Sequence, residues 1–112
     1  YKLIRLLVRQ SALESAAFRQ QWSQSYAAQL RQLAGAGGYV QSTVLAVNPA
    51  TNMPNIAIGA VDGVDELWVE SVQAGRELNA AIDAATAALA GRMLFNVRAL
   101  VAAETVIIQP PY

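Results

Sequence analysis

Residues 2–9 are almost all apolar, and in an extended chain their side chains alternate between the two faces of a β-strand. One face of this predicted strand is wholly apolar and consists of Ile4, Leu6 and Val8. The other face mixes aliphatic and basic residues, namely Leu3, Arg5, Leu7 and Arg9. We expect the wholly apolar face to pack against helices.

A helix is predicted next, because large apolar residues recur at every third or fourth position. These residues are Phe18, Trp22, Tyr26, Leu30 and Leu33. Ser11 and Glu14 have the spacing of a capping box, in which the two side chains satisfy free backbone N–H groups at the start of a helix. The glycines at positions 35, 37 and 38 predict its end.

Two further strands are predicted around a long connection. Residues 39–47 are β-prone and end at the turn signal Asn48-Pro49. Residues 64–70 alternate, with Leu67 and Val69 on one side and three residues on the other, Glu66, Trp68 and Glu70. The connection over residues 48–62 predicts either a lid or partner-facing arm, or a plain hairpin connection.

A second helix and a last strand complete the pattern. Ser71 is placed to cap the helix, and Gly91 to end it. Its predicted buried stripe consists of Leu78, Ile82, Ala85 and Leu89. Residues 97–108 form the last predicted strand, before Pro110-Pro111. The order of elements is therefore β-α-β-β-α-β.

This order predicts one α+β domain over residues 1–112, with the ferredoxin-like βαββαβ fold. Two helices would cover one face of a four-stranded antiparallel sheet and leave the other face bare. We expect the bare face to carry Leu3, Arg5, Leu7, Glu66 and Trp68. A face with so many large apolar groups predicts a homodimer, a dimeric α/β barrel in which two sheets enclose a cavity.

Composition narrows the chemistry. Only 14% of the residues are charged and 54% are hydrophobic, which also favours a homo-oligomer. There is no cysteine and no histidine, so disulfides, cysteine-based zinc sites and histidine-ligated haem are excluded, and we expect no metal and no cofactor. The scattered, balanced charges argue against nucleic acid. No segment predicts a membrane span, and a cytoplasmic location is expected.

The chain resembles the EthD family of dimeric α/β-barrel proteins over nearly its whole length. The residues that carry this resemblance are Tyr1-Lys2-Leu3-Ile4, Phe18 with Trp22, Gly38-Tyr39-Val40-Gln41, the run from Asp62 to Ser71, and the run from Ala103 to Ile108. Members typically have a histidine where this chain has Tyr26, and often a second one where it has Thr105. The EthD name comes from a link to ether degradation.

The resemblance and the pattern together suggest a candidate site. We expect Glu66 and Tyr26 to be its catalytic residues, with Glu66 moving a proton. Arg5, Trp68, Trp22 and Tyr39 are expected to bind the substrate. Plainer alternatives remain: Arg5 and Glu66 form a buried ion pair, Trp22 with Phe18 belongs to the core, Tyr26 is a core residue with its hydroxyl at the rim, and Trp68 is a dimer contact.

The wider barrel group includes cyclases, lactone isomerases and cofactor-independent monooxygenases. The resemblance therefore implies a protein that acts on a small apolar, oxygen-containing compound, such as an aromatic, lactone or polyketide-like molecule, by cofactor-free proton transfer in a catabolic or oxidative pathway. The alternative is a noncatalytic dimeric ligand-binding or accessory protein. RNA-recognition domains share the element order, but residues 64–70 carry three acids where such domains carry basic and aromatic residues.

Overall fold

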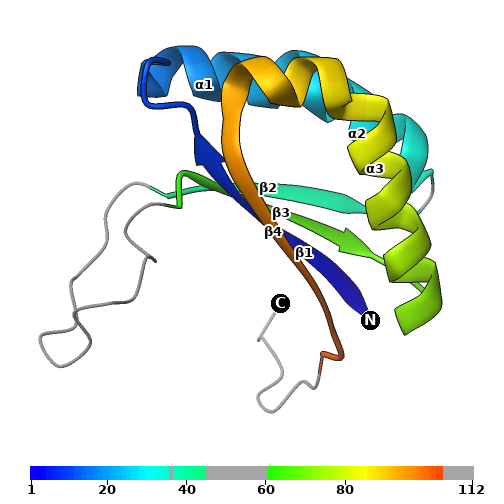
Figure 1. The fold of residues 1–112 in the computed structure, drawn as a ribbon. Helices are drawn as coiled ribbons and strands as arrows, with labels where there is room; N and C mark the ends of the chain where they lie inside the picture. The colour runs from blue at the N-terminus through cyan, green and yellow to red at the C-terminus, as the bar shows by residue number, and fades with distance from the viewer. Residues whose placement is uncertain (36, 45–60, 105–112) are drawn as a thin grey trace, which may run out of the picture.

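The structure, a computed structural model, describes residues 1–35, 37–44 and 61–104. Its elements follow the predicted order, with the first helix divided into three consecutive parts (Figure 1). They are β1 (Lys2–Arg9), α1 (Ser15–Gln21), η1 (Trp22–Tyr26), α2 (Ala27–Ala34), β2 (Tyr39–Thr43), β3 (Gly63–Trp68), α3 (Val72–Met93) and β4 (Leu94–Ala102).

The four strands form one antiparallel sheet in the order β2-β3-β1-β4, and the helices lie on one face of it (Figure 1). β1 and β3 are therefore the central strands, and the side chains on one of their two faces lie beneath the helices at the middle of the domain. The strand order and the helical layer confirm the predicted α+β, ferredoxin-like fold.

The prediction of which face of β1 packs against the helices is wrong. Leu3, Arg5 and Leu7 are buried on the helical side, at 1%, 1% and 0% exposure. They lie opposite Leu67, Asp65 and Gly63 of β3. Hydrophobic alternation does not distinguish the two faces of β1, because both carry aliphatic residues. The arginine does not decide the question either, since a buried arginine is stable when its guanidinium forms hydrogen bonds or ion pairs. We call this face, with the helices on it, the helical face of the sheet.

The opposite face, which we call the outer face, carries Ile4, Leu6 and Val8 of β1 instead. The prediction that Glu66 and Trp68 lie on the face without helices is confirmed, because Glu66 pairs with Ile4 and Trp68 with Lys2 in the register of the two strands. The side chains of Trp68, Val40 and Leu100 are each at least 40% exposed there. Within the described part of the chain, no helix covers this face (Figure 1).

The first helix buries the aromatic stripe that its sequence predicts. Phe18, Trp22, Tyr26 and Leu30 are at most 1% exposed, and the Phe18 and Trp22 rings stack with their centroids 5.6 Å apart. An α-helix turns by about 100° per residue, so residues four apart drift by about 40° at each step. The π-helical segment η1 makes a wider turn from Trp22 to Tyr26 and so keeps both side chains above the sheet.

Helix boundaries differ in part from the prediction. Ser11 forms no capping box, because the helix begins at Ser15 with Glu14 as its N-cap and without a side-chain cap bond. The end at Gly35 is confirmed, and this glycine has a φ of 59°. The cap of α3 is also confirmed, since the Ala74 N–H donates to Ser71 Oγ at 3.0 Å.

α3 runs past Gly91 to Met93, and β4 begins directly after it, three residues before the predicted start. The buried stripe of α3 contains Thr86 where Ala85 was predicted, and Ala85 is exposed. β2 ends at Thr43. The predicted turn at Asn48-Pro49, most of the connection over residues 48–62, and the predicted strand end at residues 105–108 lie outside the described residues.

Candidate functional site

The helical face of the sheet carries two buried charged residues on neighbouring central strands. Arg5 of β1 is 1% exposed, Asp65 of β3 is 0% exposed, and the two lie directly opposite each other in the strand register. A charge removed from water is costly unless hydrogen bonds or an opposite charge compensate for it. The partners of each residue therefore define what the site can do.

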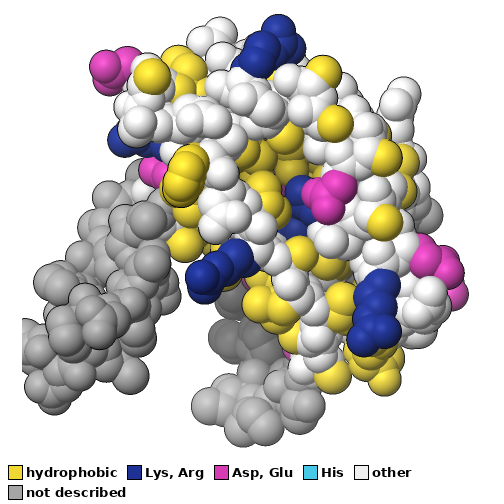
Figure 2. All heavy atoms as spheres, viewed as in Figure 1, with side chains coloured by type: hydrophobic (Ala, Val, Ile, Leu, Met, Phe, Trp, Pro, Cys, Tyr) yellow, Lys and Arg dark blue, Asp and Glu magenta, His cyan; other side chains and the backbone are white. Residues whose placement is uncertain are grey.

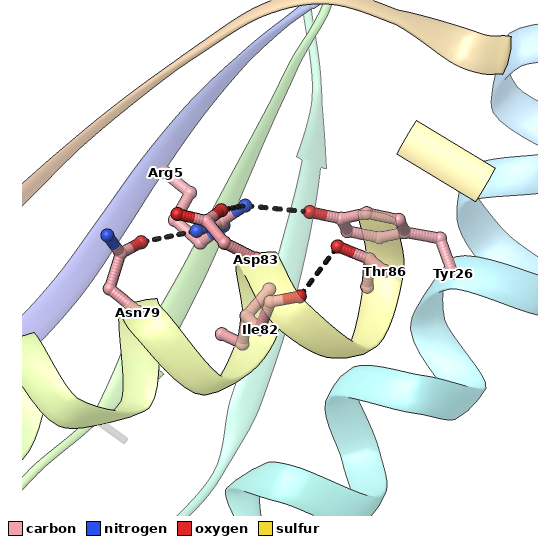
Figure 3. A network of polar contacts seen from close by, with 6 residues as sticks. All are labelled: Arg5, Tyr26, Asn79, Ile82, Asp83 and Thr86. Atoms are coloured by element: carbon pink, nitrogen blue, oxygen red, sulfur yellow. Dashed lines mark hydrogen bonds and ion pairs between the residues drawn. The ribbon is translucent and has the colours of Figure 1, made fainter. Parts of the chain in front are cut away.

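Arg5 is held by residues of two helices (Figure 3). Its Nη2 donates to Tyr26 Oη at 3.2 Å and to Asp83 Oδ1 at 3.1 Å, and its Nη1 donates to Asn79 Oδ1. Asp83 is 60% exposed, so this end of the network reaches the surface of the helical layer. On that side Figure 2 shows a hollow where basic and acidic side chains lie together among hydrophobic ones.

Asp65 is held by two aromatic donors. Trp22 Nε1 donates to Asp65 Oδ1 at 2.9 Å, and the Tyr39 hydroxyl donates to the same oxygen at 2.6 Å. Gln41 Nε2 donates to Tyr39 Oη at 2.7 Å and to the Trp22 carbonyl oxygen at 2.9 Å. Gln41 thus joins β2 to η1 and orients both donors toward one carboxylate oxygen.

Two atoms of this layer lack partners. Within the described part of the chain, Arg5 Nε and Asp65 Oδ2 are buried and form no hydrogen bond. One is a donor and the other an acceptor, and they belong to side chains on the same face of paired strands, whose Cβ atoms are typically about 5 Å apart. Buried polar groups are usually paired with protein, water or a ligand, so these two atoms can take a water molecule or a polar ligand group as their partner.

Burial also changes the acidity of the groups around these atoms. Burial raises the pKa of Asp65 to about 6, against the opposing effects of the hydrogen bonds from Tyr39 and Trp22 and of the Arg5 charge. Burial likewise raises the pKa of Tyr26, although Arg5 opposes this, and raises that of Tyr39. Both tyrosines are therefore neutral, and Tyr39 donates to Asp65 whereas Tyr26 accepts from Arg5. Asp65 exchanges its proton at a pH of about 6.

Four of the six residues predicted from the sequence come together here. Arg5, Tyr26, Trp22 and Tyr39 all belong to this buried layer. Trp22 and Phe18 are also core residues, as the plainer alternative states. The predicted roles of the four residues in catalysis or binding stay predictions.

Glu66 and Trp68 lie apart from this group, on the outer face. The predicted Arg5–Glu66 ion pair is wrong, because the two side chains are on opposite faces of the sheet. Glu66 instead pairs with Lys2, whose Nζ lies 3.7 Å from Glu66 Oε2 and 5.5 Å from the centre of the Trp68 ring. Their roles as catalytic and binding residues stay predictions for the outer face.

Sequence reasoning missed the central acid of the site. Asp65 is two positions before Leu67, which was placed correctly on the helical face, so strict alternation puts Asp65 on the same face. The more distant partners, Asn79 and Asp83, follow one another by four positions and face Arg5 from one side of α3. No sequence signal links them to a residue on β1.

The arrangement suits hydrogen bonding and proton transfer. Among residues 1–35, 37–44 and 61–104, no three histidine, cysteine, aspartate or glutamate side chains come together as a metal site. In the same ranges, none of the helices has both the length and the apolar character that crossing a membrane requires. The chemical groups at hand are a guanidinium, a carboxyl group titrating near neutral pH, and neutral aromatic donors.

Comparison with known proteins identifies the fold. No protein-family model matches the sequence, and no curated protein matches it. Among solved structures, the chain is similar to the Arabidopsis thaliana protein At3g17210, with 16% identity and a TM-score of 0.64 over 96% of this chain and 98% of that one.

It is also similar to a dimeric ferredoxin-like protein of unknown function from Thermobifida fusca. That likeness has 16% identity and a TM-score of 0.53, and it covers 88% of this chain and 85% of the other. At such low identity the likenesses show the fold alone. The chain is therefore a ferredoxin-like α+β protein whose function must be argued from its own residues.

Proposed function

We propose that the protein is a homodimer whose subunits each bind a small, mainly apolar compound with a hydroxyl or carbonyl oxygen, and transfer a proton on it, between the sheet and the helices. The observation that carries this proposal is the pair of unpartnered buried atoms, Arg5 Nε and Asp65 Oδ2, on opposite residues of β1 and β3.

The chemistry of these atoms favours one kind of ligand group. A hydroxyl accepts one hydrogen bond and donates another, so a single ligand oxygen can accept from Arg5 Nε and donate to Asp65 Oδ2. The surroundings favour an apolar body for the ligand, since Leu3, Leu7 and Leu67 lie on the same buried face. A small phenol, enol or hydroxyketone combines both features.

Proton transfer follows from the same geometry. The ionised Asp65 carboxylate takes a proton from the carbon next to a carbonyl group, and the electrons of that C–H bond form an enolate. Arg5 donates a hydrogen bond to the enolate oxygen and stabilises its negative charge. Return of the proton from Asp65 to carbon or oxygen completes the step. Because the pKa of Asp65 is about 6, the base form dominates above that pH.

The dimeric part of the proposal is supported by the outer face. Leu6, Val64 and Ile4 lie at its centre, with more exposed apolar side chains around them, and no described helix covers them. A large apolar sheet surface is stable when a second copy covers it. The similar Thermobifida fusca protein is described as dimeric.

The EthD relationship, with a role in a catabolic or oxidative pathway, is also part of this proposal. It is supported by the residues quoted in the sequence, of which Trp22, Tyr39 and Asp65 now form one hydrogen-bonded group. In this group Tyr26, which stands where members typically have a histidine, donates no proton to a base but accepts a hydrogen bond from Arg5.

The alternative is a noncatalytic dimeric binder. One observation favours it: both terminal nitrogens of the Arg5 guanidinium already have partners, so Arg5 is tied to α3 and η1 before any ligand arrives. A binder needs only apolar side chains around the ligand and one polar anchor, whereas catalysis also needs Asp65 to act as a base.

Deuterium uptake from D₂O at the methyl carbon of 2′-hydroxyacetophenone, a phenol with an acetyl group, tests the proposal. We expect the wild type to accelerate uptake, with a rate that rises with pH, reaches half of its maximum at about pH 6 and levels off above that. The Asp65→Asn variant should lose about a hundredfold in rate, which is typical for removal of a general base. Glu66→Gln, which changes the neighbouring residue of the same strand, should keep the wild-type rate of uptake.

Three other outcomes decide against parts of the proposal. Saturable binding of the ketone without any uptake that depends on Asp65 would favour the noncatalytic binder. Loss of uptake in Glu66→Gln, with Asp65→Asn active, would place the base on the outer face as the sequence predicted. Absence of binding by the folded wild type would reject a ligand of this class.

A further inference from the structure

A second hollow of the molecule lies outside the Arg5–Asp65 layer. It is a pocket of about 220 Å³ between the first half of α3 and strand β4. This volume is below the range of roughly 300–1,000 Å³ that is usual for pockets holding drug-sized ligands, so its ligand must be small. The residues that line it are Leu3, Val72, Gly75, Arg76, Asn79, Ala99, Leu100 and Val101.

One face of α3 forms the helical wall of this pocket. Val72, Gly75, Arg76 and Asn79 are spaced at i, i+3, i+4 and i+7, so they follow one side of the helix. Gly75 allows this wall to approach β4 closely, because a Cβ atom at that position would lie 2.7 Å from Val101 Cγ2. The opposite wall is aliphatic.

The charge of the pocket is positive. Arg76 is its only ionisable lining residue, and it forms no salt bridge with any residue in the described ranges. The positions three and four residues before and after Arg76 on α3 are Gln73, Val72, Asn79 and Ala80, so no acidic side chain on the helix is placed to neutralise it. An exposed, unpaired guanidinium at the rim of a pocket with one aliphatic wall favours an anion with a hydrocarbon body.

Asn79 adds a second donor. Arginine has only donor groups, so the atom of Asn79 that faces Arg5 must be the carboxamide oxygen. The amide nitrogen is then turned away from Arg5, as Figure 3 shows, and Asn79 is also a lining residue of the pocket. An N–H donor fixed in this way complements a carboxylate oxygen beside the Arg76 guanidinium.

We propose that the pocket between α3 and β4 binds a small monocarboxylate with an aromatic or short aliphatic body, whose carboxylate is held by Arg76 and Asn79 and whose hydrocarbon part lies against Leu3, Ala99 and Val101. This site neighbours the proposed proton-transfer site, since Leu3 borders both and Asn79 is bonded to Arg5, but Arg5 and Asp65 do not line it.

Benzoate is a suitable probe, because its ring and single carboxylate match the two parts of the pocket. Titration of the wild type, followed by the backbone amide NMR signals of Gly75, Ala99 and Val101, should show saturable binding with a dissociation constant of about 1 mM, as expected for so few ligand atoms. Benzamide, which has the same shape without the charge, should bind more weakly.

Arg76→Gln should weaken benzoate binding about tenfold, since it removes a charge-assisted hydrogen bond. The matched control is Arg92→Gln, which removes an exposed arginine from the other end of the same helix and should leave the affinity unchanged. Ala99→Leu, which fills the aliphatic side of the pocket, should weaken benzoate and benzamide alike.

The proposal is overturned if benzoate shifts signals elsewhere in the protein, if Arg76→Gln and Arg92→Gln weaken it equally, or if benzamide and benzoate bind with the same affinity. These readouts do not involve proton transfer or Asp65. A failure here therefore leaves the proposed proton-transfer function standing, and failure of the deuterium-uptake experiment leaves this proposal standing.

Discussion

Asp65 is a carboxyl group with no exposed surface, held by an indole and a phenol that both donate to the same oxygen. Burial outweighs these hydrogen bonds and the charge of Arg5, and it raises the pKa of Asp65 from 3.8 to about 6. Folding therefore favours the protonated form of this side chain. The ionised form that the proposed chemistry uses is the form that folding stabilises less.

This property predicts how stability depends on pH. Well below pH 4 Asp65 is protonated in both states. As pH rises from about 4 to about 6 the unfolded chain loses the proton first, so the contribution of Asp65 to the free energy of unfolding falls by an amount on the order of 3 kcal/mol. Urea unfolding at several pH values should show that Asp65→Asn lacks this loss.

Glu70→Gln provides the control for this prediction. It removes an exposed carboxyl group just beyond the end of the same strand, and it should leave the wild-type pH dependence of unfolding in place. Identical pH dependence in Asp65→Asn and the wild type would mean that Asp65 ionises in the folded protein as readily as in the unfolded chain.

Single residues also show where sequence reasoning reached its limit. Four of the residues named from the sequence, Arg5, Trp22, Tyr26 and Tyr39, share one buried layer, and their roles stay predictions. Alternation from Leu67 could have added Asp65. It could not have shown that Arg5 is bonded to Asn79 and Asp83, because contacts between a strand and a distant helix leave no spacing signal in the chain.

At the scale of elements, the η1 segment and strand β3 fit together at one glycine. A Cβ atom on Gly63 would lie 2.7 Å from the Trp22 ring, so only glycine lets the indole lie flat over β3 and reach Asp65. The wide π turn from Trp22 to Tyr26 serves the same purpose from the helical side.

Gly63→Ala should therefore destabilise the protein by about 1–3 kcal/mol, the usual cost of overpacking a core, and should shift the Trp22 indole signal. Gly91→Ala is the matched control. Nothing lies within 4 Å of a Cβ atom there, and alanine inside α3 should stabilise the helix by about 0.5–1 kcal/mol. Equal effects of the two substitutions on chemical denaturation would contradict the close fit.

The order of elements could be predicted because each segment has its own hydrophobic period. The helical face of β1 could not, because Leu3 and Leu7 are as apolar as Ile4 and Leu6. The decision depends on the register with β3, where Arg5 meets Asp65 and Leu3 meets Leu67. Such pairing becomes visible only when the strands are placed side by side.

At the scale of the whole molecule, the two faces of the sheet differ in what they carry. The helical face encloses the polar layer, and the outer face presents Leu6, Val64 and Trp68 without a described helix above them. A chain with only 14% charged residues has few charged groups with which to keep such a surface in water. Covering it with a second copy explains both observations.

Leu6→Glu tests this interface, because it introduces a charge at the centre of the outer face, opposite Val64. We expect sedimentation velocity at micromolar concentration to show a dimer for the wild type and a monomer for the variant. Ala81→Glu introduces the same charge at an exposed position of α3 and should remain dimeric. A wild type that sediments as a monomer would reject the proposed dimer.

The two tryptophans of the chain lie on opposite faces of the sheet, so their indole N–H signals in NMR spectra report on the two faces separately. Titration with 2′-hydroxyacetophenone, with the signals assigned through Trp68→Phe, tests most directly where the small-molecule site lies. A ligand bound between the sheet and the helices should shift the Trp22 signal saturably and leave the Trp68 signal in place. A shift of Trp68 with an unchanged Trp22 would contradict this account and place the ligand on the outer face.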